Sequence, residues 1–124
     1  MADHNKLGNK GENLAVALLR EKGYTILAEN WRFGKNEIDI VARIGDTMVF
    51  VEVKTRSTNS FGNPEKSVTR GKQKRTIQAA NAYLEKFEID LEARFDIVSI
   101  VVFGSKTKLE HMEDAFFPLA WSIF

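Results

Sequence analysis

The segment EIDIVARIGDTMVFVEVKTR, residues 37–56, decides the fold. Two runs rich in isoleucine and valine flank Gly45-Asp46, a pair that suits a tight two-residue turn between antiparallel strands. If Gly45 and Asp46 form this turn, Ile44 pairs with Thr47, and the residue numbers of each further pair sum to 91. The sequence therefore predicts a β-hairpin with a defined register.

The two faces of this hairpin differ in polarity, because successive side chains along a strand point to opposite sides. One face is almost wholly apolar and belongs in a core, and its members are Ile38, Ile40, Ala42, Ile44, Thr47, Val49, Val51 and Val53. The other face is apolar near the turn (Val41, Met48, Phe50) and charged at the open end, where the register places Asp39 opposite Glu52 and Glu37 opposite Lys54.

Two facing carboxylates need a reason, since like charges on opposed residues, with Cβ atoms about 5 Å apart, destabilise a sheet. Mg²⁺ typically binds one or two carboxylates together with phosphate oxygens and water. We expect Asp39 and Glu52 to hold such an ion, with the Val53 carbonyl as a backbone ligand. The Lys54 ammonium would orient or activate a water, or stabilise charge on a phosphate. The alternative interpretation is an ordinary charged strand end without a metal.

The spacing of Asp39, twelve intervening residues and Glu52-Val53-Lys54 resembles the PD-(D/E)xK motif of the restriction-endonuclease-like superfamily. With the segments around it, the spacing makes the chain resemble the YraN-like family of small bacterial proteins over about residues 8–117. These segments are GENLAVALLREKGYTILAENWR (11–32), NEIDIVAR (36–43), VFVEVKTR (49–56), the basic helix start and RFDIVSI (94–100).

The resemblance implies a restriction-endonuclease-like α/β fold, a mixed central β-sheet flanked by helices, similar to archaeal Holliday-junction resolvases. It implies a nuclease that depends on Mg²⁺ or Mn²⁺ and acts on DNA, including branched or repair and recombination intermediates. The matching catalytic residues are Glu12, Asp39, Glu52 and Lys54. One position departs from the family pattern, because Asn36 stands where the family usually has glycine. Asparagine also tolerates left-handed backbone angles, so we expect little consequence.

Two alternatives stay open beside a DNA nuclease. One is a catalytically silent nucleic-acid-binding or assembly module on the same fold, and the other is a nuclease that acts on RNA. Glu12 also has two interpretations. It can close a capping box with Asn9, or it can approach the metal as a third contact, since it shares a helical stripe with Ala15, Val16 and Leu19.

Positive charge is concentrated in one segment, although the net charge of the chain is only +1. From Lys54 to Arg75 there are seven basic residues and one acidic residue. Such clustering is the footprint of phosphate binding, and a phosphate is attracted to a helix start whose cations oppose the macrodipole. The alternative is a solvated basic face. The residues expected to contact nucleic acid are Arg56, Arg70, Lys72, Gln73, Lys74 and Arg75.

Three further features are less specific. Arg94-Phe95-Asp96 also matches the family pattern, and we interpret it as structural, with both charges paired to neighbouring loops at the mouth of a strand. His4 and His111 are isolated and lack the spacing of metal ligands. Trp31 and Trp121 can stack on bases, but partly buried anchors are the more ordinary interpretation.

The remaining pattern predicts the order helix, strand, strand, strand, helix, strand, strand. Asn9 caps the first helix and Gly23 ends it, while Ile77, Ala80, Leu84 and Phe87 form the buried stripe of the second. The predicted ranges are a helix at about 11–22, a strand at 24–28, the hairpin, a surface loop at 57–64, a helix at about 69–87, a buried strand at 95–103 and an edge strand at 108–113.

Composition sets the outer limits. A chain of 124 residues with 44% hydrophobic and 28% charged residues is typical of one globular domain. We expect a single nuclease domain over residues 1–124, with residues 1–8 flexible. The chain has no cysteine, no secretory signal and no apolar run of about 18 residues, which together favour the cytoplasm. The apolar tail AFFPLAWSIF (115–124) packs on the body or on the second subunit of a homodimer.

Overall fold

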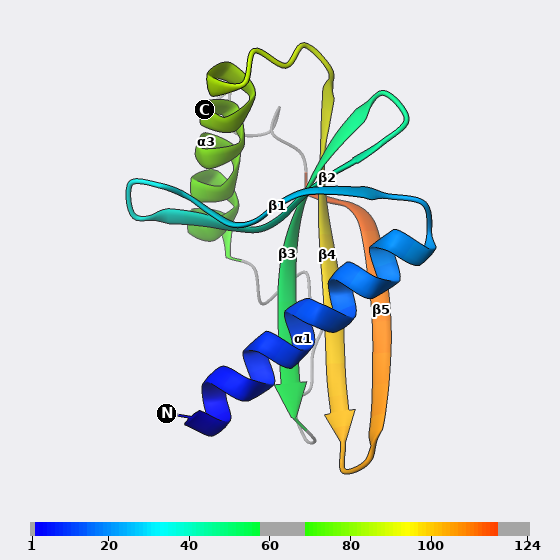
Figure 1. Cartoon of the computed structure of the whole chain (residues 1–124). Helices are drawn as coiled ribbons and strands as arrows, with labels where there is room; N and C mark the ends of the chain where they lie inside the picture. Colours follow the sequence, from blue (N-terminus) through cyan, green and yellow to red (C-terminus); the bar gives the residue numbers. More distant parts are fainter. Residues whose placement is uncertain (1, 58–68, 117–124) are drawn as a thin grey trace.

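The computed structural model describes residues 2–57 and 69–116. Its helices and strands follow the predicted order (Figure 1). The elements are α1 (Ala2–Glu21), β1 (Thr25–Phe33), β2 (Asn36–Ile44), β3 (Thr47–Ser57), α3 (Arg70–Lys86), β4 (Glu92–Phe103) and β5 (Lys106–Phe116).

The five strands form one mixed sheet in the order β1-β2-β3-β4-β5. Neighbouring strands are antiparallel except β3 and β4, which are parallel and are connected through α3. As predicted, β5 lies at an edge of the sheet. Five mixed strands flanked by two helices form a restriction-endonuclease-like α/β fold, which confirms the predicted fold class.

The register predicted for the central hairpin is confirmed near the turn, but the predicted pairs Asp39–Glu52 and Glu37–Lys54 do not form, because the ladder ends before them and Glu37 pairs with Arg32 on β1. Residue pairs run from Ile44 and Thr47 at the turn to Ile40 and Val51, and Gly45 has the positive φ of +56° that the turn requires. Beyond this last pair, β2 continues its pairing with β1, where Ile38 lies opposite Trp31. The two carboxylate-bearing positions therefore lie where β2 leaves β3.

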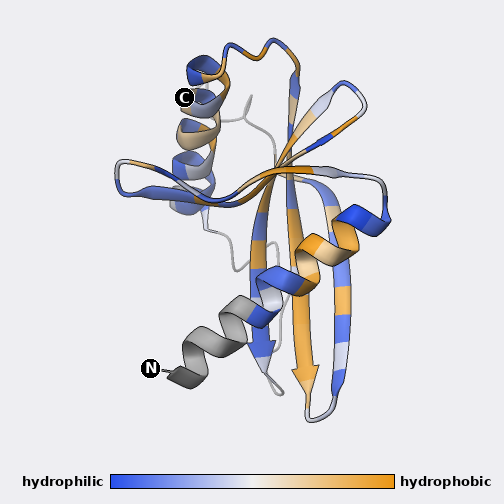
Figure 2. Cartoon of the chain, in the orientation of Figure 1, coloured by the Kyte–Doolittle hydropathy of each residue, from blue (hydrophilic) through white to orange (hydrophobic). Residues whose placement is uncertain are grey.

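Both faces of the sheet are buried, one under each helix (Figure 1). The core beneath α1 contains the hairpin residues Ile40, Ala42, Val49 and Val51, whereas the core beneath α3 contains Val41, Met48 and Phe50. Figure 2 shows that β4, which lies between the two cores, is hydrophobic along much of its length. The assignment of Ile38 to the same face as Ile40 is wrong, because Ile38 packs in the core beneath α3. Strict alternation fails where β2 turns away from β3.

The first helix begins earlier than predicted. Its backbone is helical from Ala2, so Asn9 lies within the helix and does not cap it. Residues 2–8, which we expected to be flexible, continue the same helix. The predicted end is correct, since Gly23 has φ +95° and the Tyr24 N–H donates to the Leu19 carbonyl at 2.9 Å. This is the hydrogen-bond pattern of a glycine-terminated helix.

The second helix agrees with the prediction at both ends. Thr69 caps it by accepting a hydrogen bond from the Lys72 N–H, and Phe87 follows its last residue. The buried stripe contains Ile77 and Ala80 as predicted, but Tyr83 replaces Phe87, whose side chain is 49% exposed because the helix has already ended there.

Several strand predictions differ in length. The strand predicted at residues 24–28 extends through Phe33. The strand predicted to be buried at residues 95–103 ends at Phe103, whose side chain is exposed. No helix in the described ranges is long and apolar enough to cross a membrane. The predicted loop and the apolar tail lie outside the described residues, apart from Ser57, Ala115 and Phe116.

Candidate active site

Asp39 lies at the point where β2 separates from β3. Its Oδ2 atom accepts a hydrogen bond of 2.8 Å from the Val53 N–H. The side chain thus takes a backbone donor that the departing strand no longer meets. Because the N–H and C=O of one residue in a strand point toward the same neighbouring strand, the Val53 carbonyl faces the side on which Asp39 lies.

Glu52 is buried, with 4% of its surface exposed, and only one of its carboxylate oxygens is paired among the described residues. The Oε1 atom is 3.4 Å from Lys72 Nζ and 3.7 Å from Lys54 Nζ. The Oε2 atom is buried and has no hydrogen-bond partner in the described part of the chain. A buried polar oxygen without a partner is costly, so this atom is the strongest indication that the site binds a cation or a hydrogen-bond donor.

The ionisation of Asp39 reflects this environment. Burial raises the pKa of Asp39 from 3.8 to about 7, and the negative charges of Glu52 and then Glu12 act in the same direction. The hydrogen bond from Val53 and the charge of Lys72 oppose the rise. Carboxylates that share a site resist simultaneous ionisation, which shows that these side chains are electrostatically coupled.

Glu12 approaches the same region from α1. The preceding residue, Gly11, touches β3 so closely that an added Cβ would lie 2.0 Å from the Thr55 hydroxyl oxygen. Only glycine permits this approach, which positions Glu12 at the edge of the sheet. Its Oε2 atom accepts a hydrogen bond of 3.1 Å from Asn30 Nδ2. The capping-box interpretation is wrong, because the helix extends beyond Asn9.

The donor set suits a hard divalent cation that keeps water ligands. Within residues 2–57 and 69–116, no group of three or more His, Asp or Glu side chains is arranged to hold a metal. Mg²⁺ does not require three, since one or two carboxylates with water and substrate phosphate are typical. The unpaired Glu52 Oε2, the Asp39 carboxylate and the Val53 carbonyl fit that requirement. Glu12 is close enough for its negative charge to raise the pKa of Asp39.

A cavity of about 320 Å³ opens beside Asp39. The start of α3 contributes Lys72, Arg75 and Thr76 to its wall, and the β1–β2 hairpin contributes Lys35, Asn36 and Glu37. Asn36 is in an extended strand, and the left-handed angle at the turn between β1 and β2 belongs to Gly34 (φ +61°). A cavity lined by three cations and by the carboxylates of Glu37 and Asp39 can receive a phosphate group on its cationic side.

The structure divides the predicted nucleic-acid contacts into two groups. Lys72 and Arg75 belong to the cavity, and Gln73 is half-buried on the same helix. Arg70 and Lys74 are exposed near the start of α3, and Arg56 is half-buried on β3, two residues beyond Lys54. The first turn of α3 has no acidic residue of its own, and Lys72 in this turn pairs with Glu52 on β3.

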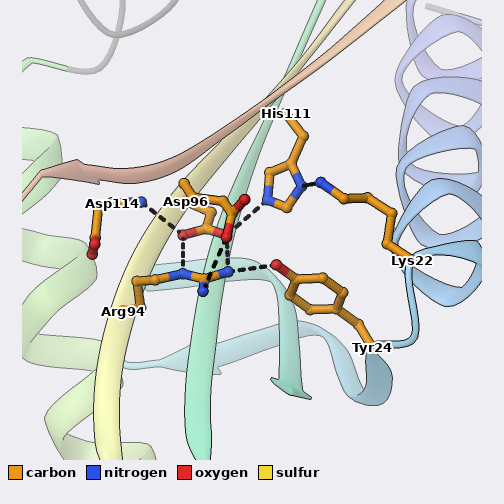
Figure 3. Close-up of polar contacts among 7 residues, drawn as sticks. Lys22, Tyr24, Arg94, Asp96, His111 and Asp114 are labelled. Carbon is orange, nitrogen blue, oxygen red and sulfur yellow. Dashed lines mark hydrogen bonds and ion pairs between the residues drawn. The ribbon is translucent and has the colours of Figure 1, made fainter. Parts of the chain in front are cut away.

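A second polar cluster joins β4, β5 and the end of α1, as Figure 3 shows. Asp96 is fully buried, and its carboxylate receives two hydrogen bonds from Arg94, at 2.8 and 2.9 Å, and one of 2.7 Å from His111 Nε2. Lys22 Nζ lies 2.6 Å from His111 Nδ1. A carboxylate oxygen accepts, so His111 Nε2 is the donor in its bond to Asp96. These bonds outweigh burial and lower the pKa of Asp96.

This cluster agrees with the structural interpretation of Arg94 and Asp96. Sequence reasoning missed the contact of His111 with Asp96 in this cluster and, at the Asp39 site, the contact of Lys72 with Glu52. His111 carries no local signal, because its partner is on another strand. The contact of Lys72 had a weak signal in the sequence, because a lysine in the first turn of the helix that follows β3 can reach back to that strand.

Comparisons with known proteins agree with the resemblance found in the sequence. The model of "Uncharacterised protein family UPF0102" matches residues 11–100. A UPF0102 protein of Christiangramia forsetii is 50% identical over 94% of this chain and 98% of its own length. A UPF0102 protein of Phocaeicola vulgatus is 49% identical over 98% of this chain and all of its own length. A Geobacter metallireducens relative is 48% identical over 94% of this chain and 97% of its own length.

Proposed function

The chain belongs to the UPF0102 family, which confirms the resemblance to YraN-like proteins, and we propose that it is a metal-dependent nuclease acting on DNA. The observation that carries this proposal is the buried Glu52 Oε2, which lacks a partner among the described residues and lies in the electrostatic field of Asp39. A divalent cation would bind both carboxylates at once and would favour the ionised form of Asp39 against the effect of burial.

In this proposal Asp39, Glu52 and the Val53 carbonyl hold Mg²⁺ or Mn²⁺. The ion supplies Lewis acidity toward a phosphodiester and lowers the pKa of an attacking water. Lys54 and Lys72, both within 4 Å of Glu52 Oε1, pair with that carboxylate and present positive charge to the phosphate. Glu12 orients water at the sheet edge.

The proposed DNA surface extends from the cavity across the start of α3. Arg75 in the cavity wall and the exposed Arg70 and Lys74 follow one another over the first turns of this helix. Phosphates are attracted both to these cations and to the free N–H groups of a helix start. Such contacts fix the position of the backbone without reading the sequence.

One observation favours a second candidate, a nucleic-acid-binding module without catalysis. Glu52 Oε1 is already paired with two lysines, and the described residues hold no group of three metal-binding side chains. If these ion pairs persist in the bound state, the site serves only to anchor α3 on β3. The basic surface would then bind DNA in the same way with or without a metal.

Cleavage of defined DNA substrates tests the proposal. Linear, nicked, flapped and four-way DNA are incubated with the wild type in Mg²⁺ or Mn²⁺, with Asp39→Ala purified in parallel. We expect metal-dependent products from the wild type alone. Equal products from both proteins would indicate a contaminating nuclease, and DNA binding without cleavage in either metal would support the silent module.

A further inference from the structure

The β1–β2 hairpin carries an exposed aromatic ring beside the cavity. Phe33, the last residue of β1, is 49% exposed. Its ring is parallel to that of Trp31 within 3°, with ring centroids 6.5 Å apart. Trp31 is half-buried and packs edge-on against the buried Tyr83 of α3, with 5.1 Å between ring centroids. Phe33 is therefore backed by an aromatic side chain that is itself anchored on the body.

The conformation of this hairpin is defined at its tip. Phe33 pairs with Asn36 across a turn in which Gly34 has φ +61°, and Arg32 forms a 3.3 Å ion pair with Glu37 across the strands. Asn36 and Glu37, the residues opposite Phe33 and Arg32, line the cavity together with Asp39. The aromatic ring and the proposed phosphate site therefore belong to the same short hairpin.

A flat exposed ring beside a cationic cavity matches one class of ligand. Nucleic-acid bases offer an aromatic face, and proteins hold unpaired nucleotides by combining stacking side chains with cations along the backbone. The cavity supplies those cations as Lys35, Lys72 and Arg75. In an intact duplex the base faces are covered by neighbouring bases, so a stacking residue next to the phosphate site requires a base that has left the stack.

We propose that Phe33, supported by Trp31, stacks on an unpaired base adjacent to the phosphate bound in the cavity. This inference rests on the proposed function and specifies its substrate class, which is DNA with a single-stranded or disrupted segment at the cleavage position. Trp31 acts as the support and Phe33 makes the contact. Fully paired DNA would engage the start of α3 but leave Phe33 in water.

The test measures binding in EDTA, where no cleavage occurs. Two labelled DNAs of equal length are compared, a full duplex and the same duplex with a short unpaired segment. The wild type should prefer the unpaired DNA by roughly 10-fold, as expected for one stacked base. Phe33→Ala should lose this preference and keep its duplex affinity. Phe33→Trp should retain the preference, and unpaired DNA should quench the fluorescence of the added tryptophan.

Phe103→Ala is the matched control, because Phe103 is similarly exposed (44%) on the β4–β5 hairpin, away from the cavity residues. It should change neither affinity. A preference that survives in Phe33→Ala would overturn the inference, and so would a Phe33→Ala variant that alters only self-association, which would assign the ring to a protein interface. Either result leaves the proposal of cleavage at Asp39 and Glu52 standing. A wild type that does not cleave DNA but still prefers the unpaired DNA would refute the nuclease activity and leave the stacking of Phe33 standing.

Discussion

The Val53 N–H donates a 2.8 Å hydrogen bond to Asp39 Oδ2 at the point where β2 leaves β3. A side-chain carboxylate thus occupies the place of the next main-chain pair in the ladder. This bond holds the Asp39 carboxylate in place and opposes the rise of its pKa, which burial and then the negative charge of Glu52 cause. The local geometry of the hairpin therefore accounts for both the position and the unusual ionisation of the central residue.

Binding of a divalent cation should stabilise the protein through Glu52. A ligand at 100 times its Kd adds about 2.7 kcal/mol to the free energy of unfolding, which raises the Tm of a domain of this size by several degrees. Thermal unfolding at pH 8 with Mg²⁺ or Mn²⁺ should show this shift for the wild type and not for Glu52→Gln. Glu110→Gln, at an exposed position on β5, is the control and should respond as the wild type does.

The stability of Asp39→Asn relative to the wild type should increase with pH. The pKa of Asp39 is about 7 in the folded protein and 3.8 ordinarily, so the folded state binds the proton more tightly. Its favourable contribution is complete below about pH 4 and is lost as the pH rises toward 7. Asparagine cannot ionise and avoids this loss, which we expect to be about 1–3 kcal/mol. Urea unfolding without metal at pH 5 and pH 8 measures the difference, and a pH-independent difference would contradict it.

Asp96→Asn should have the opposite pH dependence. Hydrogen bonds from His111 and Arg94 lower the pKa of Asp96 against the effect of burial, so its contribution is present at neutral pH and lost as the pH falls through the folded-state pKa. Removing one partner of a buried ion pair typically costs about 3–5 kcal/mol. Denaturation at pH 7 should show this loss, and it should shrink at acid pH. A loss that grows on acidification would be inconsistent with the cluster.

Neutralising the start of α3 should change the salt dependence of DNA binding. Arg70→Gln with Lys74→Gln removes two exposed cations, and each lost phosphate contact should flatten the slope of log affinity against log salt by about 0.9. Duplex sequences should be affected alike. The control is Lys106→Gln with Lys108→Gln, two exposed positions on β5, which should leave the slope unchanged. If the α3 double variant and the β5 double variant have the same slope of log affinity against log salt, the start of α3 is not part of the DNA surface.

Local chemistry in the sequence was sufficient to predict much of the fold. Gly45 and Asp46 defined the hairpin register, Gly23 ended α1, and Thr69 to Phe87 bounded α3, because each signal acts within a few residues. The predicted start of α1 was wrong for a related reason. Asn9 can cap a helix, but it also tolerates a helical conformation, and nothing local forces the helix to begin there.

Features that depend on distant contacts could not be predicted in the same way. Ile38 changes cores because β2 departs from β3 to follow β1, and alternation along one strand carries no information about that bend. The pairing of His111 with Asp96 joins two strands, and the approach of Lys72 to Glu52 depends on how α3 crosses the sheet. The closeness of Asp39 to Glu52 could be predicted from the sequence, because both residues belong to one hairpin.

The most direct measurement is the single-turnover rate of DNA cleavage by the wild type and Glu52→Gln, purified in parallel, as Mn²⁺ is titrated. We predict cleavage that saturates with Mn²⁺, stops on chelation, and falls by about 100-fold or more in Glu52→Gln, while DNA binding in EDTA is retained. Cleavage that is equal in the two proteins, or absent from a wild type that binds the DNA and the metal, would contradict the account.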